Sequence, residues 1–372
     1  FSQRTRMDIG TYVTSEPDDP LTDTRGGSEV VTTTNHHPVV SAPDDVTIPI
    51  RTPFTLEGSA TDSDDDELIY LWEQNDIGDS GGVQLTNNTK ATGPLFRVFG
   101  TSADVSDTDT LLYNSPGENL ATTSPVRTFP DMAQIASGNT NAATGACPTP
   151  VTSDYSGAEG TSALKLSSVL DCYSEFLPTA DYVGSNANAT PPRLNFRLTA
   201  RDLHAEGGGT QYDDVTLTID PAAGPFLVES QATPTTYDGG STQAVTWAVN
   251  ETADLAPDVK ISLSTDGGTS FPVVLAARTP NDGTHQVTLP AMATDRARIK
   301  IEAVDNYFFD INDADFSITG GAEPTPTPDP SPSPSPDPSP SPSPDPSPSP
   351  SQDPSPSPSP SPDPSPSPTP DP

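Results

Sequence analysis

Residues 54–73 read FTLEGSATDSDDDELIYLWE, and this stretch contains the pattern that decides the fold. Two short segments with β-strand composition, Phe54–Ala60 and Leu68–Glu73, flank an acidic turn. Short strands separated by turn residues are typical of an antiparallel β-sandwich. Similar segments occur on either side, at Val46–Ile50 before this stretch and around residues 194–198 and 215–219 after it.

A second run of short strands follows Gly224 and extends to Thr319. The predicted strands are Phe226–Ser230, Ala244–Val249, Val259–Ser264, Val273–Ala276, Gln286–Leu289, Ala297–Val304 and Phe316–Thr319. Trp72 and Trp247 each fall in the middle of a predicted strand, and we expect each to anchor the core of its own module rather than to hold a ligand.

These patterns predict a mostly β fold with two antiparallel Ig/PKD-like β-sandwich modules in tandem, residues 38–223 and 224–319. The irregular stretch from about 79 to 190 is too long for an ordinary loop, and we interpret it as an insertion into the first module.

The hydrophobic fraction of 31% is too low for one large packed domain of 372 residues. Residues 320–372 explain part of this, because from Glu323 onward they repeat Ser-Pro, Thr-Pro and Asp-Pro. Such a tract has nothing to bury, so it predicts a disordered spacer of polyproline-II character.

The formal net charge is −36, of which the tail contributes only −7 through six Asp and Glu323. A folded region this acidic repels nucleic acid and anionic lipid, which excludes both as expected partners. No run approaches the roughly 20 apolar residues of a membrane helix. We expect a monomer whose partner is an extracellular protein or a surface glycan.

Two cysteines, Cys147 and Cys172, lie in one Gly/Ser/Thr-rich region with no histidine near them in sequence. Two cysteines alone do not make a tetrahedral zinc site, so a disulfide in an oxidising compartment is predicted. A bridge of this span would stabilise the fold by about 3 kcal/mol.

Residues 1–13, FSQRTRMDIGTYV, place Phe1, Ile9, Tyr12 and Val13 at roughly helical spacing. A helix of this length is marginal alone, so we expect it to be the last helix of an upstream domain. Residues 14–37 are polar and form a predicted linker. Because the chain begins at Phe1 rather than Met, the lack of a signal peptide says nothing about export.

Asp62, Asp64 and Asp66 occupy alternate positions of the acidic turn, as in an EF-hand loop. The glycine that an EF-hand requires is replaced by Glu67, and the flanks are strand-like, so a true EF-hand is excluded. Two interpretations stay open, a weaker calcium site or a plain acidic turn. The same two apply to a second cluster, formed by Asp310, Asn312, Asp313 and Asp315.

Other motifs point to structure rather than catalysis. Residues 78–82, GDSGG, match the nucleophile motif of trypsin-like proteases around Ser80, but that chemistry requires a histidine base. The upstream histidines, His36 and His37, lie in the linker without the expected flanking pattern. Residues 264–271, STDGGTSF, resemble an Asp-box hairpin, which is a structural turn. No His-Glu-x-x-His motif occurs.

Longer phrases carry a family resemblance, among them FSQRTRMDIGTYVTS, TPFTLEGSATDSDDDELIYLWEQND, GPLFRVFG, DCYSEFLPTADYVG, LNFRLTARD and VKISLSTDGGTSF. The chain resembles the region after the catalytic domain in bacterial secreted reprolysin-like zinc metallopeptidases, a branch of the metzincins. The resemblance spans residues 1–319. It implies that residues 1–13 close the peptidase domain, whose zinc ligands lie upstream.

By this resemblance the chain has no catalytic residue or zinc of its own, and calcium is the one cofactor to consider. The acidic turn of related sequences usually reads Asp-Gly-Asp, where this chain has Asp64-Asp65-Asp66. The first functional hypothesis is therefore an accessory region of an exported metallopeptidase. The alternative is a stand-alone extracellular adhesin or surface-display protein with a proline-rich spacer. Both place the chain outside a bacterial cell.

Overall fold

The computed structural model describes most of the two predicted modules. The described residues are 33–78, 87–96, 121–149, 171–185, 191–205 and 207–320, with the backbone alone of 155–156, 165–166 and 168–170. The helix predicted at 1–13, the linker up to residue 32 and the tail from residue 321 lie outside these ranges, as do residues 79–82 of the protease-like motif.

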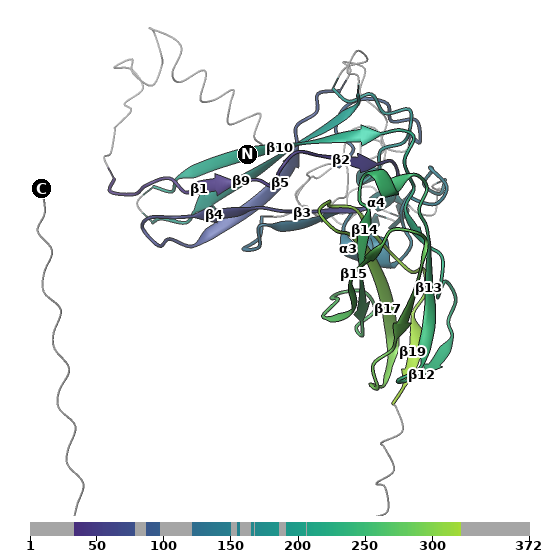
Figure 1. The fold of residues 1–372 in the computed structure, drawn as a ribbon. Helices are drawn as coiled ribbons and strands as arrows, with labels where there is room; N and C mark the ends of the chain where they lie inside the picture. The colour runs from purple at the N-terminus through teal and green to yellow at the C-terminus, as the bar shows by residue number, and fades with distance from the viewer. Residues whose placement is uncertain are drawn as a thin grey trace, which may run out of the picture. The chain divides into compact units, whose positions relative to one another are not determined.

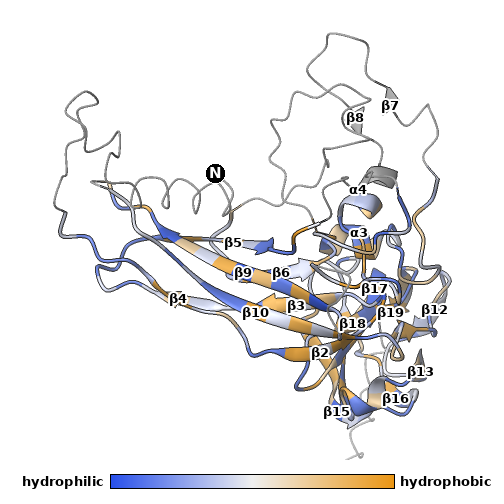
Figure 2. Ribbon diagram, turned by 90° about the horizontal axis from the view of Figure 1, so that it is seen from above, coloured by the Kyte–Doolittle hydropathy of each residue, from blue (hydrophilic) through white to orange (hydrophobic). Residues whose placement is uncertain are grey.

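A four-stranded sheet forms one layer of the first module (Figure 1). Its strands, in spatial order, are β2 (Val46–Pro49), β10 (Thr210–Asp220), β9 (Arg193–Asp202) and β5 (Leu68–Gln74). β9 pairs antiparallel with both neighbours, whereas β2 runs parallel to β10. Apolar and polar residues alternate along β9 and β10 (Figure 2), because successive side chains of a strand point to opposite faces.

The second layer covers the apolar face of this sheet. β3 (Phe54–Glu57) pairs with β6 (Val126–Phe129), and β4 (Ser59–Thr61) pairs with β1 (Val39–Ser41). Phe54 packs against Phe129 and against Phe196 of β9, with ring centroids 5.1 and 5.7 Å apart. Burial of each such side chain stabilises the fold by about 1.5–3 kcal/mol, so this aromatic cluster holds the two layers together.

Parts of the stretch 79–190 belong to the sandwich itself, which corrects its interpretation as an insertion. β6 supplies a strand, and Leu95, Phe96 and Phe176 are buried in the same core. These residues are separated by Thr, Ser and Pro without a two-residue period, so their sequence gives no strand signal. The stretch also contains α3 (Met132–Ala136), β7 (Tyr155–Ser156), β8 (Lys165–Leu166) and α4 (Ser168–Ser174).

The second module also consists of two sheets. The larger has the order β12 (Thr236–Asp238), β19 (Phe316–Thr319), β17 (Thr294–Ala303), β14 (Asp258–Ser264) and β15 (Val273–Pro280), with β18 (Phe309–Ile311) also paired to β17. The smaller has the order β11 (Leu227–Val228), β13 (Thr242–Ala248) and β16 (Thr284–Thr288). A short 3-10 helix, η2 (Thr252–Asp254), follows β13. As in the first module, an early strand, here β12, runs parallel to the last one.

Each module buries its tryptophan in the core, as predicted. Trp72 and Trp247 are both 2% exposed. The Trp72 indole N–H donates to the Pro125 carbonyl at 2.9 Å, and that of Trp247 donates to Asn281 Oδ1 at 2.8 Å. Both rings are therefore structural, and the predicted fold of mostly β, antiparallel sandwich modules is confirmed. Among the described residues, no helix combines the length and the apolar character that crossing a membrane requires.

Candidate functional site

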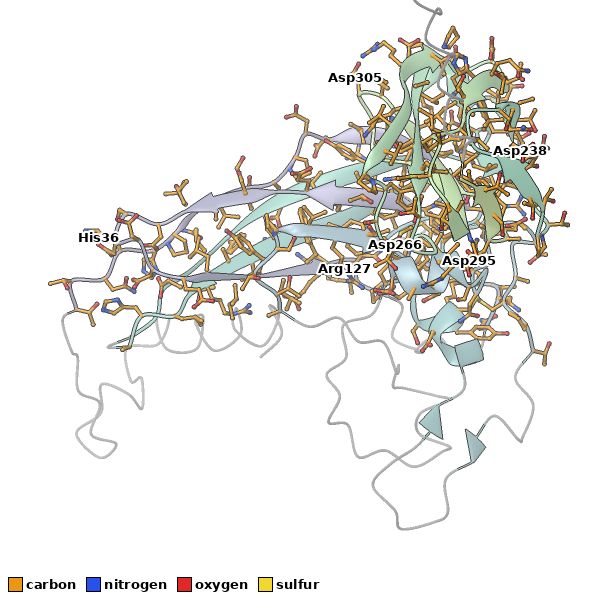
Figure 3. All side chains as sticks on the ribbon, turned by 90° about the horizontal axis from the view of Figure 1, so that it is seen from below. His36, Arg127, Asp238, Asp266, Asp295 and Asp305 are labelled. Atoms are coloured by element: carbon orange, nitrogen blue, oxygen red, sulfur yellow. A yellow bond between two sulfur atoms is a disulfide. The ribbon has the colours of Figure 1, made fainter. Side chains whose placement is uncertain are left out.

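The three aspartates of the acidic turn, residues 62–67, lie together between β4 and β5. One carboxylate oxygen from each of Asp62, Asp64 and Asp66 lies within 4.8 Å of the others. The Asp64 backbone N–H donates to Asp62 Oδ1 at 2.8 Å, which tightens the turn. His36, labelled in Figure 3, marks this end of the module, where the long strands terminate.

Asp65 occupies the position at which related sequences have a glycine in this turn. Its φ of 60° lies in the left-handed region, which glycine adopts most readily. Aspartate tolerates this conformation better than most other residues do. The turn therefore forms without the glycine, and its absence is no argument against a cation site.

Two histidines that lie far away in sequence contact these carboxylates. His36 Nδ1 lies 3.0 Å from Asp64 Oδ1, and the His36 backbone N–H donates to Asp64 Oδ2 at 2.6 Å. His204 Nδ1 lies 2.9 Å from Asp66 Oδ2. The backbone and side-chain hydrogen bonds from His36 lower the pKa of Asp64 below its ordinary value. Neither histidine has a local sequence signal for this site, because only strand pairing brings it to the turn.

Residues 35–37, which we call the lead-in segment, are fixed at the same end of the module. Asn35 Nδ2 donates to Asp202 Oδ2 at 3.2 Å and to the Gly207 carbonyl at 3.0 Å. His37 Nδ1 accepts from the Thr210 backbone N–H at 3.3 Å. The chain therefore reaches the first module at the end of β9 and the start of β10, along a path held by side-chain hydrogen bonds.

The donors of the acidic turn fit a calcium ion better than a zinc ion. Calcium takes oxygen ligands at about 2.3–2.6 Å, so three oxygens this close together could share one ion. Asp62 Oδ2 is buried and, among the described residues, has no hydrogen-bond partner. The turn thus offers a free carboxylate oxygen, although exposed acidic groups are common without an ion. Calcium at this turn stays a prediction.

The second predicted cluster is not assembled as a ligand set. Within the described part of the chain, Asp62, Asp64 and Asp66 form the only group with metal-site spacing. Asp310 is instead buried, where its Oδ2 accepts from the Val228 N–H at 2.7 Å. Burial raises its pKa to about 8, so this carboxyl is largely protonated at neutral pH.

The other members of that cluster stabilise the fold of the second module. Asn312 Oδ1 accepts from the Ile299 N–H at 2.6 Å. Asp315 Oδ1 accepts from Arg298 Nε at 2.5 Å, and Arg298 Nη1 donates to the Asn312 carbonyl at 2.6 Å. Asp313 is exposed. These contacts use oxygens of Asp310, Asn312 and Asp315 to stabilise the fold, and calcium at Asp310, Asn312, Asp313 and Asp315 stays a prediction that the structure does not support.

A disulfide joins Cys147 to Cys172 of α4, with their Cα atoms 5.8 Å apart, as predicted. Both cysteines are buried in the first core. The Cys147 N–H also donates to Asn88 Oδ1 at 2.8 Å. The bridge therefore anchors an irregular loop to α4, in a part of the module with little regular strand pairing.

The Asp-box segment forms the predicted structural turn. Asp266 Oδ1 accepts the Thr269 and Ser270 backbone N–H groups, both at 3.0 Å. Gly267 and Gly268 supply φ values of 81° and 90°. Hydrogen bonds from the hydroxyls of Ser264 and Ser270 and from the Ser270 N–H lower the pKa of Asp266 to about 2. Its carboxylate is thus fully engaged within the turn.

The two modules meet at a junction of direct contacts, not through a linker. The Thr55 N–H of β3 donates to the Tyr307 carbonyl at 3.0 Å, and the Phe309 N–H donates to the Pro53 carbonyl at 2.9 Å. Backbone groups of the first module thus pair with the segment leading into β18 of the second. Such pairing fixes both position and direction, because hydrogen bonds in a ladder are directional.

Side chains extend the junction on both sides of this pairing. Arg298 Nη2 donates to the Ala136 carbonyl at the end of α3, at 3.2 Å. Ile135 of α3 joins Phe309 and Ile311 in a small buried cluster. Asn306 Nδ2 donates to the Thr47 carbonyl at 2.9 Å. α3 therefore packs on the second module although it lies in the chain of the first.

Comparisons with known proteins add little to this geometry. No protein-family model and no curated protein matches the chain. A chimeric titin Z1Z2 functionalized with a KLER peptide from decorin is 8% identical over 77% of this chain and 100% of that one, with a TM-score of 0.19. Titin domains Z1Z2 in complex with telethonin give 10% identity, 77% and 98% coverage and a TM-score of 0.20.

Domains 4 and 5 of the S-layer protein SbsC give 11% identity over 35% of this chain and 58% of that one, with a TM-score of 0.15. Likenesses at this level carry no argument about function. The assignment of the chain to β-sandwich modules therefore stands on its own strand pairing and its two buried cores.

Proposed function

We propose that this chain is a non-catalytic accessory region of an exported zinc metallopeptidase, and that its two sandwich modules hold the enzyme in a fixed geometry. The observation that carries the proposal is the junction. Relative motion is the default for neighbouring domains in one chain unless their interface is extensive. Here backbone pairing, a hydrogen bond from Arg298 to the Ala136 carbonyl and a buried cluster around Phe309 act together.

A rigid pair of modules suits positioning better than catalysis. The junction fixes the direction of the second module relative to the lead-in segment, which lies at one end of the first module. The resemblance of residues 1–319 to sequences that follow a reprolysin-like domain is what supports a metallopeptidase as the enzyme. Zinc would belong to that upstream domain, and the proline-rich tail would act as a spacer.

The geometric part of the proposal is tested by measuring distances across the junction. We would replace Ser59 and Gln286, both exposed and in different modules, by cysteine and attach spin labels. A single narrow distance distribution is expected, because the modules move as one body. Replacing Asn306 by alanine and Tyr307 by phenylalanine, which removes side-chain bonds to Thr47 and Asp44, should broaden it. A broad distribution in the parent protein would refute rigid positioning.

The functional part is tested separately. The purified chain should not hydrolyse casein with or without added zinc, and the coding sequence immediately upstream of Phe1 should contain His-Glu-x-x-His. An export signal directly before Phe1 would instead favour the stand-alone adhesin. Proteolysis that copurifies with the chain and disappears in Ser80→Ala would revive the serine-protease hypothesis.

A further inference from the structure

The outward face of the first module's four-stranded sheet combines buried polar atoms with apolar side chains. Trp72 of β5 points into the core, so its neighbours Leu71 and Glu73 point outward. On β9, Arg197 lies opposite Glu73 and Thr199 lies opposite Leu71. These four residues form two adjacent rungs on the side of the sheet that faces away from the core.

A face open to water would leave these side chains exposed, but they are not. Glu73 is 6%, Arg197 8% and Thr199 1% exposed. Within the described residues, Glu73 Oε2, Arg197 Nη1 and Thr199 Oγ1 have no hydrogen-bond partner. Each buried polar atom left in this state costs about 1–3 kcal/mol, so the face has the properties of one that another segment covers.

The neighbouring contacts show what this covering segment has to supply. Arg197 is already neutralised, because its Nε and Nη2 each donate to Asp214 at 2.6 Å, and it stacks on the Tyr212 ring at 3.4 Å. Among the described residues, no ion pair to the Glu73 carboxyl is formed. Tyr212 on β10 remains 45% exposed, so the cover lies over the β5–β9 side. A cationic group followed by apolar side chains would match it.

We propose that this face docks residues 1–13 of the same chain as an amphipathic helix. Arg6, Ile9 and Val13 follow one another at intervals of three and four residues, which places them on one side of a helix. Arg6 pairs with Glu73, and the apolar residues pack on the Leu71 rung.

Charge and chain path favour this occupant over others. Residues 1–13 carry Arg4 and Arg6 against Asp8, which makes them net positive in a chain of net charge −36. The lead-in segment is fixed where β9 ends and β10 begins, beside this face. Ile69 of β5 pairs with Arg201, next to the Asp202 that holds the lead-in segment. From Ile69, Glu73 lies four residues further along β5, about 14 Å, a distance that the linker before the lead-in segment spans easily.

The proposal does not depend on which enzyme precedes the chain. It makes the sheet a docking face for whatever residues 1–13 belong to, so that the first module is coupled to the upstream part by a surface as well as by a linker. A second copy of the chain and an unrelated partner are the competing occupants.

The test measures carbodiimide labelling of the Glu73 carboxyl by mass spectrometry in the full chain. Glu73 should be protected in the parent protein, and Ile9→Asp with Val13→Asp should speed its labelling at least about tenfold, because the cover is displaced. The matched control, Val30→Asp with Val31→Asp in the predicted linker, should leave it protected. Arg6→Glu should also expose Glu73, whereas Arg6→Lys should not.

Three outcomes would overturn the proposal. Rapid labelling in the parent protein would mean that nothing covers the face. Protection unchanged by the Ile9 and Val13 substitutions would assign the cover to another segment, and protection that falls on dilution would assign it to a second copy. Unchanged circular dichroism across the variants would show that global unfolding is not the cause.

Discussion

The two acidic segments of this chain, Asp62–Asp66 and Asp310–Asp315, have similar compositions but different structural roles. In the first, three carboxylates converge at an exposed turn, and one Asp62 oxygen has no partner within the described part of the chain. In the second, Asp310 is buried against a backbone N–H and Asp315 is paired with Arg298. Acidic composition alone therefore does not predict which role a segment has. The first segment is hydrogen-bonded to two histidines at the surface, whereas the second is hydrogen-bonded into the core of its module.

The largest expected effect concerns Asp310. Its pKa is raised from 3.8 to about 8 in the folded protein, so between these values the folded state holds a proton that the unfolded state has lost. Stability should therefore fall as pH rises through this window, by up to about 1.4 kcal/mol per pH unit. Asp310→Asn should remove this component, as measured by urea unfolding at several pH values. Parallel pH profiles for the two proteins would contradict the assignment.

The next effect concerns Arg298. Arg298→Ala removes the donors to Asp315, to the Asn312 carbonyl and to the Ala136 carbonyl, and should lower the free energy of unfolding by about 2–3 kcal/mol. Arg296, which is largely exposed and 3.8 Å from Asp315, is the matched control. Its replacement by alanine should cost less than about 1 kcal/mol. Equal losses would mean that burial of Arg298 is unimportant.

Added calcium should distinguish the two acidic segments by its effect on stability. If the acidic turn binds calcium, about a thirtyfold excess over Kd should raise the free energy of unfolding by about 2 kcal/mol. Asp64→Asn should abolish this gain, while Asp313→Asn in the other segment should retain it. Isothermal titration of both variants provides an independent readout. No heat and no shift in Tm for the parent protein would leave the turn as a plain acidic loop.

The smallest effect concerns Asp266. Its carboxylate differs from those of both acidic segments, because all its hydrogen bonds come from residues of its own turn. Its pKa is lowered to about 2, so its contribution is present above its ordinary pKa of 3.8 and is lost as pH falls toward 2. Because the group is only partly buried and its hydrogen bonds lie within one turn, Asp266→Ala should cost less than about 1 kcal/mol at neutral pH. A larger loss by thermal unfolding would show a role beyond the turn.

Sequence patterns predicted most strands because their signals are local. Alternation and turn residues located β5, β9, β14 and β17, and the Asp-box turn followed from its glycines. β12 and β18 were missed, since Thr236–Asp238 is short and polar and Phe309–Ile311 lies within an acidic stretch. β6 was missed because its neighbours in sequence look like a loop, although Phe129 completes an aromatic core.

The candidate site was only partly accessible from sequence for a related reason. The spacing of Asp62, Asp64 and Asp66 is local and was recognised. His36 and His204 lie 28 and 138 residues from the carboxylates they contact, and strand register alone brings them there. The burial of Asp310 likewise depends on β11, more than 80 residues away. Neither contact has a local sequence pattern.

The parallel pairing of β2 with β10, and of β12 with β19, has a mechanical consequence. In each module the first strand of the pair begins at one end of the ladder, and its parallel partner finishes at the other end. A pull applied through the two ends of the chain loads all the rungs together in shear, instead of opening them one by one. A module pulled from both ends of its chain would therefore yield to force only after several hydrogen bonds break at once.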